Sequence, residues 1–292
     1  MRALGGALAV FAALALAAGD AAAAKPLKVR FPSADAAGTL IGGLYYKPDV
    51  NSGRPGRRAG VIMLHGCAGM LTKSGKLKRR PKFWAEWLAD QGYAVLLADS
   101  FNPRGFRSIC QTAARPLSPK RDRPFDAYGA LKFLQVQPEV NPGRIALMGW
   151  SNGAMTLLWA VREGAPARPA DLTDGFRAAV AFYPGCIALG RKPYATDVPT
   201  LLQLGRADDW TPAAPCLKMV REAAGRGVPI EADAYDGAYH GFDNPALEIK
   251  TVVTRNNASK TKERRVHVGT DVAARVAAIE RVRDFLATRL AE

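Results

Sequence analysis

The sequence predicts an α/β fold in which a mostly parallel central sheet carries helices on both faces. Short apolar runs with the length of strands alternate with longer helix-forming stretches along most of the chain. Some of these runs, such as residues 60–64, contain no polar side chain, which is typical of strands covered on both faces. No internal repeat and no linker divides the sequence, so we expect one domain over residues 25–292.

The first two strands, residues 27–31 and 40–46, are expected to be antiparallel and to precede the alternating pattern. The following strands are predicted at residues 60–64, 93–98, 144–148, 178–182, 198–204 and 230–235. The helices are predicted at residues 83–91, 125–137, 154 to the stop signal at 162–166, 212–226 and 271–290. The apolar face of the closing helix is expected to consist of Ala273, Val276, Ile279, Val282 and Phe285.

Residues 149–153 read Gly-Trp-Ser-Asn-Gly and lie between a predicted buried strand and a predicted helix. This G-x-S-x-G pattern is typical of a nucleophile elbow, a sharp strand-to-helix turn that exposes a serine. Gly149 and Gly153 suit such a turn because a Cβ at either position would clash with the crowded backbone. The flanking strand and helix favour Ser151 as a nucleophile over a residue of an ordinary loop.

A serine nucleophile needs a general base, and the chain contains 3 histidines. His240 follows the serine and the strand predicted at 230–235, as expected when a triad runs in the order Ser, Asp, His. His267 also follows the serine, but the charged residues before it indicate a solvated segment. His65 precedes the serine and is interpreted as a loop-shaping residue whose ring is hydrogen-bonded nearby. His240 is therefore the predicted base.

Two adjacent aspartates follow the strand predicted at 198–204 and compete for the role of the triad acid. Asp208 lies three residues after Gly205 and four before Pro212, a spacing that favours it as the acid. Asp209 is interpreted as a turn-forming or helix-capping residue. In a triad the acid would hold the imidazole tautomer and stabilise the imidazolium that forms.

An acyl-transfer site also needs hydrogen-bond donors for the oxyanion of the tetrahedral intermediate. The backbone N–H of Asn152, directly after the nucleophile, is one candidate. The second is the backbone N–H of Cys67, in the loop after the strand predicted at 60–64.

Four motifs occur in the order and at the spacing of an α/β-hydrolase fold. They are HGCAG at 65–69, GWSNG at 149–153, GRADDWTP at 205–212 and YHGFDNP at 239–245. Together they resemble the dienelactone hydrolase family, from about residue 28 to the C-terminal helix.

The resemblance implies an acyl hydrolase in which Ser151, Asp208 and His240 hold the nucleophile, acid and base positions. Phe242 and Asp243 match the family's usual H-G-F-D ending. The best-known members use a cysteine nucleophile, lack the His-Gly oxyanion loop and are cytoplasmic. The resemblance therefore implies an ester- or lactone-cleaving acyl hydrolase rather than one defined lactone substrate.

The N-terminus predicts export. Arg2 precedes an apolar, alanine-rich run over residues 3–18, and small residues at 19–24 provide a cleavage site. Residues 1–24 are therefore predicted to be a signal peptide, because the run is shorter than the roughly 20 apolar residues that span a bilayer. We expect a periplasmic or secreted protein without stable membrane insertion.

The chain has 4 cysteines, and an oxidising compartment permits disulfides. Four cysteines allow three pairings, and spacing alone does not choose among them. The predicted topology favours Cys186 with Cys216, which lie near adjacent strands, and leaves Cys67 with Cys110 in loops at the carboxyl end of the sheet. The latter bridge would clamp the oxyanion loop.

The formal net charge is +15, and the basic residues gather in two predicted loops at the carboxyl end of the sheet, where ligands bind in such folds. They are Lys73, Lys76, Lys78, Arg79, Arg80 and Lys82, and Arg104, Arg107, Arg115, Lys120, Arg121 and Arg123. This rim would attract an anionic substrate, although a solvated basic surface is the competing interpretation. Among these residues Arg104 is the candidate for substrate binding, together with the aromatic residues Trp150, Trp210 and Tyr239 beside the predicted triad.

The predicted partner is a small ester or lactone, and neither a metal nor a cofactor is expected, because no metal-ligand spacing occurs. Basic stretches with interleaved aromatic residues are absent from the sequence, which argues against nucleic-acid binding. No oligomeric state is predicted. Two alternatives stay open: a peptidase of the prolyl oligopeptidase type and a non-catalytic binding protein of the cell envelope.

Overall fold

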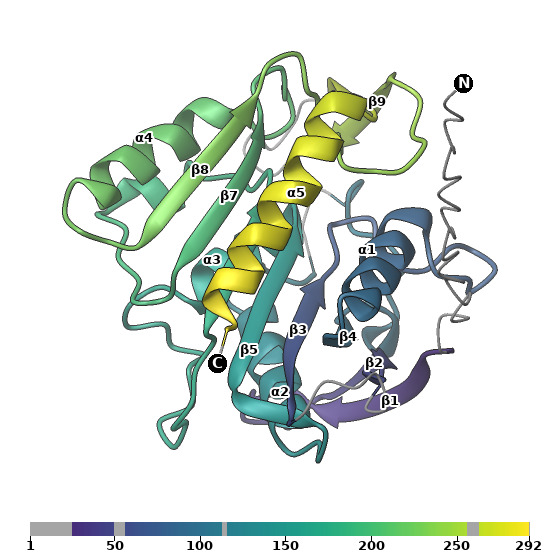
Figure 1. Ribbon diagram of the computed structural model, residues 1–292. Helices are drawn as coiled ribbons and strands as arrows, with labels where there is room; N and C mark the ends of the chain where they lie inside the picture. The colour runs from purple at the N-terminus through teal and green to yellow at the C-terminus, as the bar shows by residue number, and fades with distance from the viewer. Residues whose placement is uncertain (1–24, 50–55, 113–115, 256–262, 292) are drawn as a thin grey trace, which may run out of the picture.

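The computed structural model describes residues 25–49, 56–112, 116–255 and 263–291, so the predicted signal peptide lies outside the described residues. An eight-stranded sheet in the order β1-β2-β4-β3-β5-β6-β7-β8 forms the centre of the protein (Figure 1). Its strands are β1 (Leu27–Pro32), β2 (Leu40–Tyr46), β3 (Arg58–Leu64), β4 (Ala94–Asp99), β5 (Val140–Trp150), β6 (Ala178–Phe182), β7 (Thr200–Gly205) and β8 (Ile230–Tyr235). The helices are α1 (Arg79–Asp90), α2 (Arg123–Gln135), α3 (Asn152–Ala160), α4 (Ala213–Ala224) and α5 (Val272–Arg289), with short 3-10 turns at η1 (Asn102–Arg104) and η2 (Leu189–Arg191).

The direction of the strands confirms the predicted fold class. Strand β2 is antiparallel to both β1 and β4, whereas β4, β3, β5, β6, β7 and β8 run parallel to one another. Parallel neighbours need crossover connections, which the helices provide. The carboxyl ends of β3, β5 and β7 therefore meet at one edge of the sheet, which brings the loops after them together.

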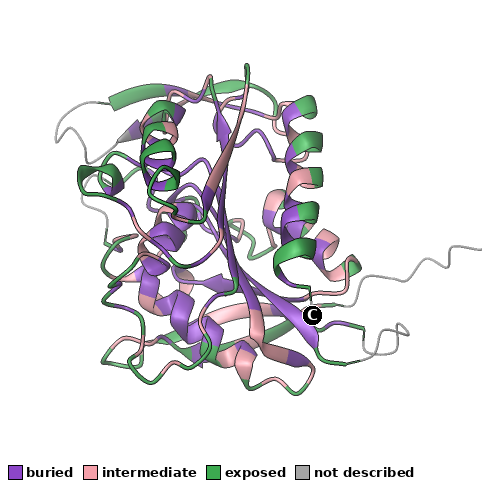
Figure 2. Cartoon of the chain, turned by 60° about the vertical axis from the view of Figure 1, so that its left-hand side comes forward, coloured by how far each residue is buried: buried purple, intermediate pink, exposed green. Residues whose placement is uncertain are grey.

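Each face of the sheet has its own layer of helices. Alternate residues of β3 belong to two separate apolar clusters: Ile62 and Leu64 pack with residues of α2, α3 and α4, whereas Val61 and Met63 pack with residues of α1 and α5. Every residue of β3 is buried, as the unbroken apolar run predicts. Figure 2 shows the buried strands between two layers of helices whose outer faces are exposed. None of the helices in the described ranges is long and apolar enough to cross a membrane.

A two-stranded hairpin outside the main sheet was not predicted. Strands β9 (Lys250–Arg255) and β10 (Glu263–Val268) pair with each other in antiparallel fashion. The charged residues before His267 were interpreted as a solvated segment, and the described ones among them are exposed. Residues 263–265 are exposed, but Val266 and Val268 alternate inward and are buried, which is the pattern of a strand with one covered face.

The predicted apolar face of α5 was also partly wrong, since Val276 is 47% exposed and Ala273 is exposed as well. Steps of three residues turn by 300° around a helix, so the predicted stripe drifts away from one face. The buried face uses mainly steps of four and consists of Ala274, Ala278, Val282, Phe285 and Leu286.

The packing of α5 leads to a prediction about stability. Phe285→Ala should lower the free energy of unfolding by about 3–5 kcal/mol, because Phe285 is 4% exposed and its loss leaves a cavity. Val276→Ala removes an exposed side chain and should change this free energy by less than about 0.5 kcal/mol. Urea denaturation of both variants measures the difference; equal effects would contradict the assignment of the buried face.

Candidate active site

Ser151 lies on a sharp turn between β5 and α3, as predicted. Its backbone has φ 51° and ψ −112°, so it is one of the described non-glycine residues with positive φ. Its N–H donates to the carbonyl of Phe182 in the adjacent strand β6, at 2.9 Å. Strained backbone conformations of this kind persist only where the surroundings impose them, and they cluster at functional sites.

The two glycines of the elbow are required by close backbone contacts. A Cβ on Gly153 would lie 2.1 Å from the carbonyl oxygen of Leu64, and one on Gly149 would lie 2.6 Å from the carbonyl oxygen of Gly153. The start of α3 is thus pressed against the end of β3. This contact places Ser151 beside the loop that follows β3.

Asp208 and His240 form a buried pair at the end of β7 and in the loop after β8. The Nδ1 of His240 lies 2.8 Å from Oδ2 of Asp208, and both residues are buried. The other carboxylate oxygen, Oδ1, accepts the backbone N–H groups of Trp210 and Thr211 at 2.9 and 2.8 Å. The Thr211 hydroxyl lies 3.0 Å from Oδ2. These bonds fix the carboxylate, and the carboxylate in turn fixes Nδ1 as the protonated ring nitrogen, leaving Nε2 as the basic atom.

Ser151 and His240 line the same pocket. In the described part of the chain the Ser151 hydroxyl makes no hydrogen bond to the ring of His240, whose described bonds go through Nδ1 to Asp208 and Thr211. Such catalytic hydrogen bonds are commonly long in hydrolases without substrate and tighten when substrate binds.

Asp209 does not cap the helix that follows it, and its side chain binds a histidine instead. The Oδ1 of Asp209 accepts the backbone N–H of His267 at 2.8 Å, and the Nδ1 of His267 lies 2.8 Å from the Oδ2 of Asp209. The N-cap of α4 is Pro212, which has no side-chain capping bond. The two adjacent aspartates therefore hold different histidines: Asp208 holds His240 and Asp209 holds His267.

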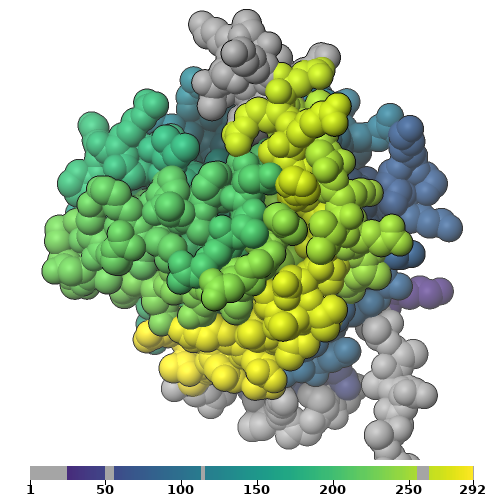
Figure 3. Space-filling model, turned by 90° about the horizontal axis from the view of Figure 1, so that it is seen from above, coloured from purple at the N-terminus to yellow at the C-terminus, as the bar shows by residue number. Residues whose placement is uncertain are grey.

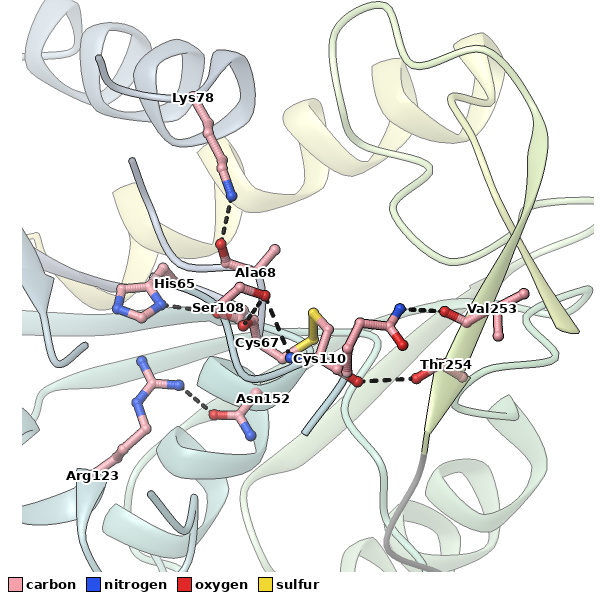
Figure 4. Close-up of a disulfide and its surroundings, with 12 residues drawn as sticks. His65, Cys67, Ala68, Lys78, Ser108, Cys110, Arg123, Asn152, Val253 and Thr254 are labelled. Atoms are coloured by element: carbon pink, nitrogen blue, oxygen red, sulfur yellow. Dashed lines mark hydrogen bonds between the residues drawn. A yellow bond between two sulfur atoms is a disulfide. The ribbon is translucent and has the colours of Figure 1, made fainter. Parts of the chain in front are cut away.

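The two predicted oxyanion donors lie at the start of α3 and after β3. Asn152 is the first residue of α3, where a backbone N–H has no partner within the helix. Its side-chain oxygen accepts a hydrogen bond from the buried Arg123 (Figure 4). Burial lowers the pKa of Arg123 to about 10, which still leaves it cationic at neutral pH.

Both disulfides that the topology favoured are present. Cys186 and Cys216 join the segment after β6 to α4, and Cys67 and Cys110 join the loop after β3 to the loop after β4. The carbonyl of Cys67 also accepts the N–H of Ile109 at 2.8 Å. Figure 4 shows Cys67, Cys110 and the hairpin residues Val253 and Thr254 side by side. The loop after β3 is therefore held covalently.

His65 shapes this loop, as predicted. Its Nδ1 lies 2.9 Å from the carbonyl oxygen of Gly66, and its ring packs edge-on against Phe101 with the centroids 4.4 Å apart. Burial lowers the pKa of His65 well below 6.5, and the charge of Arg123 lowers it further. The ring is therefore neutral at pH 7, and Nδ1–H donates to the carbonyl.

The pocket has a volume of about 330 Å³ and includes two of the predicted aromatic residues, Trp150 and Trp210. Tyr239 is absent from its lining, and its ring packs at a tilt against His267 with the centroids 5.2 Å apart. Arg104 is absent too, because both of its terminal nitrogens donate to the buried carboxylate of Asp126 at 2.9 Å. The expectation that Arg104 and Tyr239 contact substrate is therefore corrected: a fully buried carboxylate captures the arginine.

Three other cations, Lys78, Arg79 and Arg80, do line the pocket. Arg80 belongs to the predicted basic rim but was not singled out. Its guanidinium donates to the hydroxyl of Tyr183 at 2.8 Å. A Cβ on Gly66 would lie 3.6 Å from both the Nη2 of Arg80 and the Cβ of Ser151, so the guanidinium lies close to Ser151.

Behind Arg80, the carboxylate of Asp243 is fully buried and accepts hydrogen bonds from three aromatic side chains. The indole N–H groups of Trp84 and Trp150 donate to Oδ2 at 2.8 and 2.7 Å, and the Tyr183 hydroxyl donates to Oδ1 at 2.5 Å. Burial raises the pKa of Tyr183, so its hydroxyl stays protonated and links Arg80 to Asp243. The sequence signalled Asp243 only through the H-G-F-D motif. Among the described residues, no three His, Cys, Asp or Glu side chains gather as a metal site.

Comparisons with known proteins agree with this architecture. The family model described as the dienelactone hydrolase family matches residues 42–290. A dienelactone hydrolase-like promiscuous phosphotriesterase from metagenomic libraries is similar in structure, with 22% identity, 91% of this chain and 99% of that chain covered, and a TM-score of 0.62. A thermophilic esterase from Thermogutta terrifontis has 17% identity, 89% and 92% coverage and a TM-score of 0.60. A structure of the same esterase phosphorylated by paraoxon has 17% identity, 89% and 94% coverage and a TM-score of 0.61.

The burial of His65 predicts a pH dependence of stability. Its folded-state pKa lies below the value of 6.5, so only the unfolded state takes up a proton as the pH falls through 6.5. Stability from this group is complete above pH 6.5 and should fall by up to about 1.4 kcal/mol per pH unit below it. His65→Asn, which keeps a donor near the position of Nδ1, should flatten the free energy of unfolding between pH 7 and 5. Parallel curves for the two proteins in urea titrations would refute this role.

Proposed function

Because the chain belongs to the dienelactone hydrolase family and is a hydrolase of ester bonds, we propose that it cleaves a small ester or lactone through Ser151, His240 and Asp208. The observation that carries this proposal is the buried Asp208–His240 pair, whose imidazole lines the same pocket as the serine of the elbow. This arrangement has the nucleophile, base and orienting acid that acyl transfer needs.

In this mechanism the hydroxyl of Ser151 attacks the ester carbonyl while Nε2 of His240 takes its proton. The negative oxygen of the tetrahedral intermediate is stabilised by the backbone N–H groups of Cys67 and Asn152. His240 then protonates the leaving alcohol, and an acyl group remains on Ser151. Water, deprotonated by His240, releases the acid and restores the serine.

The solved relatives support this chemistry. One of them is esterase 2 of Thermogutta terrifontis, and one structure of this esterase is phosphorylated by paraoxon. Paraoxon is an electrophile, and phosphorylation by it requires that a group of that esterase attack it as a nucleophile. The same reaction class is the one proposed here for Ser151.

The charge of the pocket favours an anionic substrate. Lys78, Arg79 and Arg80 are part of its lining, and no carboxylate occurs among the described residues that line it. Burial and the charge of Arg80 lower the pKa of Lys78, which indicates that the cations repel one another until an anion joins them. We propose a carboxylate-bearing ester or lactone on this basis.

Two disulfides support the proposal that residues 1–24 direct export to the periplasm or the medium. Disulfides form and persist in such oxidising compartments. No observation favours the peptidase or the binding-protein alternative.

Ser151→Ala and His240→Ala should each lower kcat on p-nitrophenyl acetate by at least about 10³-fold, and the double variant should be little worse, because the residues act as one unit. Labelling by a fluorophosphonate probe should disappear in Ser151→Ala. Lack of labelling in the wild type would support a binding protein, and cleavage of proline-containing peptide amides would support a peptidase.

Asp208→Asn should impair kcat far more than Asp209→Asn, because Asp208 binds His240 whereas Asp209 binds His267.

Arg80→Gln should lower kcat/KM for a monoester of a dicarboxylic acid about 10- to 100-fold, because a charge-assisted hydrogen bond is lost. The matched neutral ester should lose less than about threefold. Lys82→Gln serves as the control, since Lys82 is exposed and lies outside the pocket lining. Equal losses on both esters would contradict selection of anionic substrates by Arg80.

A further inference from the structure

The β9–β10 hairpin is fastened to the loops that carry the acid and the base. The backbone N–H and the Nδ1 of His267 both bind Asp209, next to the proposed acid, at 2.8 Å. Val268 forms a parallel bridge with His240, and the N–H of Gly269 donates to the carbonyl of His240 at 3.2 Å. The base loop and the hairpin therefore form one continuous structure.

The hairpin is also fastened to the disulfide-linked oxyanion loop. The hydroxyl of Thr254 donates to the carbonyl of Cys110 at 3.3 Å, and the side-chain amide of Gln111 donates to the carbonyl of Val253 (Figure 4). Cys110 is bonded to Cys67, the residue that supplies one proposed oxyanion donor. Seen from above (Figure 3), the yellow-green C-terminal segments lie between the green and the blue parts of the chain. The hairpin thus joins the two halves of the site.

Alternation along the two strands gives the hairpin one inner face. Val252 is paired with Val266, so their side chains lie on the same face, and Val268 follows on that face of β10. Val252 and Val268 both line the pocket that contains Ser151. Val253, one residue along, points the other way and is 39% exposed. Leu247, just before the hairpin, extends the apolar lining.

We propose that Val252 and Val268 determine which apolar group of the ester fits beside Ser151, and that the Asp209–His267 pair positions the β9–β10 hairpin that carries these valines. The inference rests on the proposed function, because it names the specificity element of the same site. The occupant is the aliphatic chain of the acyl group or the alcohol, which the valines desolvate, while the cations of α1 remain available to a charged group. Asp209 and His267 contact no substrate; they act through the hairpin.

The test measures kcat/KM on p-nitrophenyl esters from acetate to octanoate. Val252→Phe should lower the octanoate-to-acetate ratio by about tenfold or more, because a well-packed apolar pocket discriminates by about 10-fold or more per methylene. Val252→Ala should raise the ratio at least about threefold. Val253→Phe and Val253→Ala are the matched controls and should keep it within about twofold. The melting temperature Tm of each variant shows whether it is folded. If Val252→Phe does not fold, the ratio measured for Val252→Ala still tests the proposal.

The positioning pair has its own readout. His267→Ala should raise KM for octanoate at least about threefold and leave kcat within about twofold, because the β9–β10 hairpin loses its bond to Asp209 while the triad is kept. His267→Asn should restore the wild-type KM, since its amide nitrogen can replace Nδ1 as donor to Asp209. An equal fall of kcat on all esters, or no rescue by asparagine, would overturn the positioning role.

Two failures can be distinguished. A wild-type protein that hydrolyses none of these esters and does not react with a fluorophosphonate would overturn the proposed function, and this inference with it. A wild-type esterase whose chain-length ratio is the same in the Val252 and Val253 variants would overturn the inference alone.

Discussion

The close approach of two backbones at the nucleophile elbow is the constraint on which the site depends. Gly153 leaves no room for a side chain between α3 and the carbonyl end of β3, and Ser151 is held with positive φ while its N–H binds β6. Three neighbouring strands are therefore fixed relative to one serine. The loop after β3 begins at that contact, so a small change in the elbow would displace Ser151 and both proposed oxyanion donors together.

The charges around this elbow are separated in a way that suits catalysis. The carboxylates of Asp208 and Asp243 are buried and bound by several donors, whereas Arg80 and Lys78 face the pocket. A buried carboxylate is tolerated when its oxygens are satisfied, and each of these two accepts several hydrogen bonds. The pocket lining consequently contains cations and the imidazole of His240, whereas Asp208 and Asp243 lie outside this lining. Tyr183 joins the two layers through its protonated hydroxyl.

Loops build most of the site, and in this protein they are tied to one another. The Cys67–Cys110 bridge joins two of them, and the β9–β10 hairpin joins this pair to the loops of the acid and the base. Loops are ordinarily the least stable part of an α/β fold. Covalent and hydrogen-bonded ties reduce their freedom and can thereby hold the proposed oxyanion donors in place.

The sequence by itself determined the parallel sheet, the elbow and the order of Ser151, Asp208 and His240, because these depend on local patterns: apolar runs, paired glycines and fixed spacing. Only the tertiary structure decided which cations reach the pocket, since Arg104 is captured by Asp126, a residue distant in sequence, while Arg80 remains. It also decided that Asp209 binds His267, which is 58 positions away in the sequence. The buried residues of α5, spaced mainly four apart, were likewise set by the tertiary structure. Long-range partners and the orientation of a helix are set by packing against other elements, which no local pattern records.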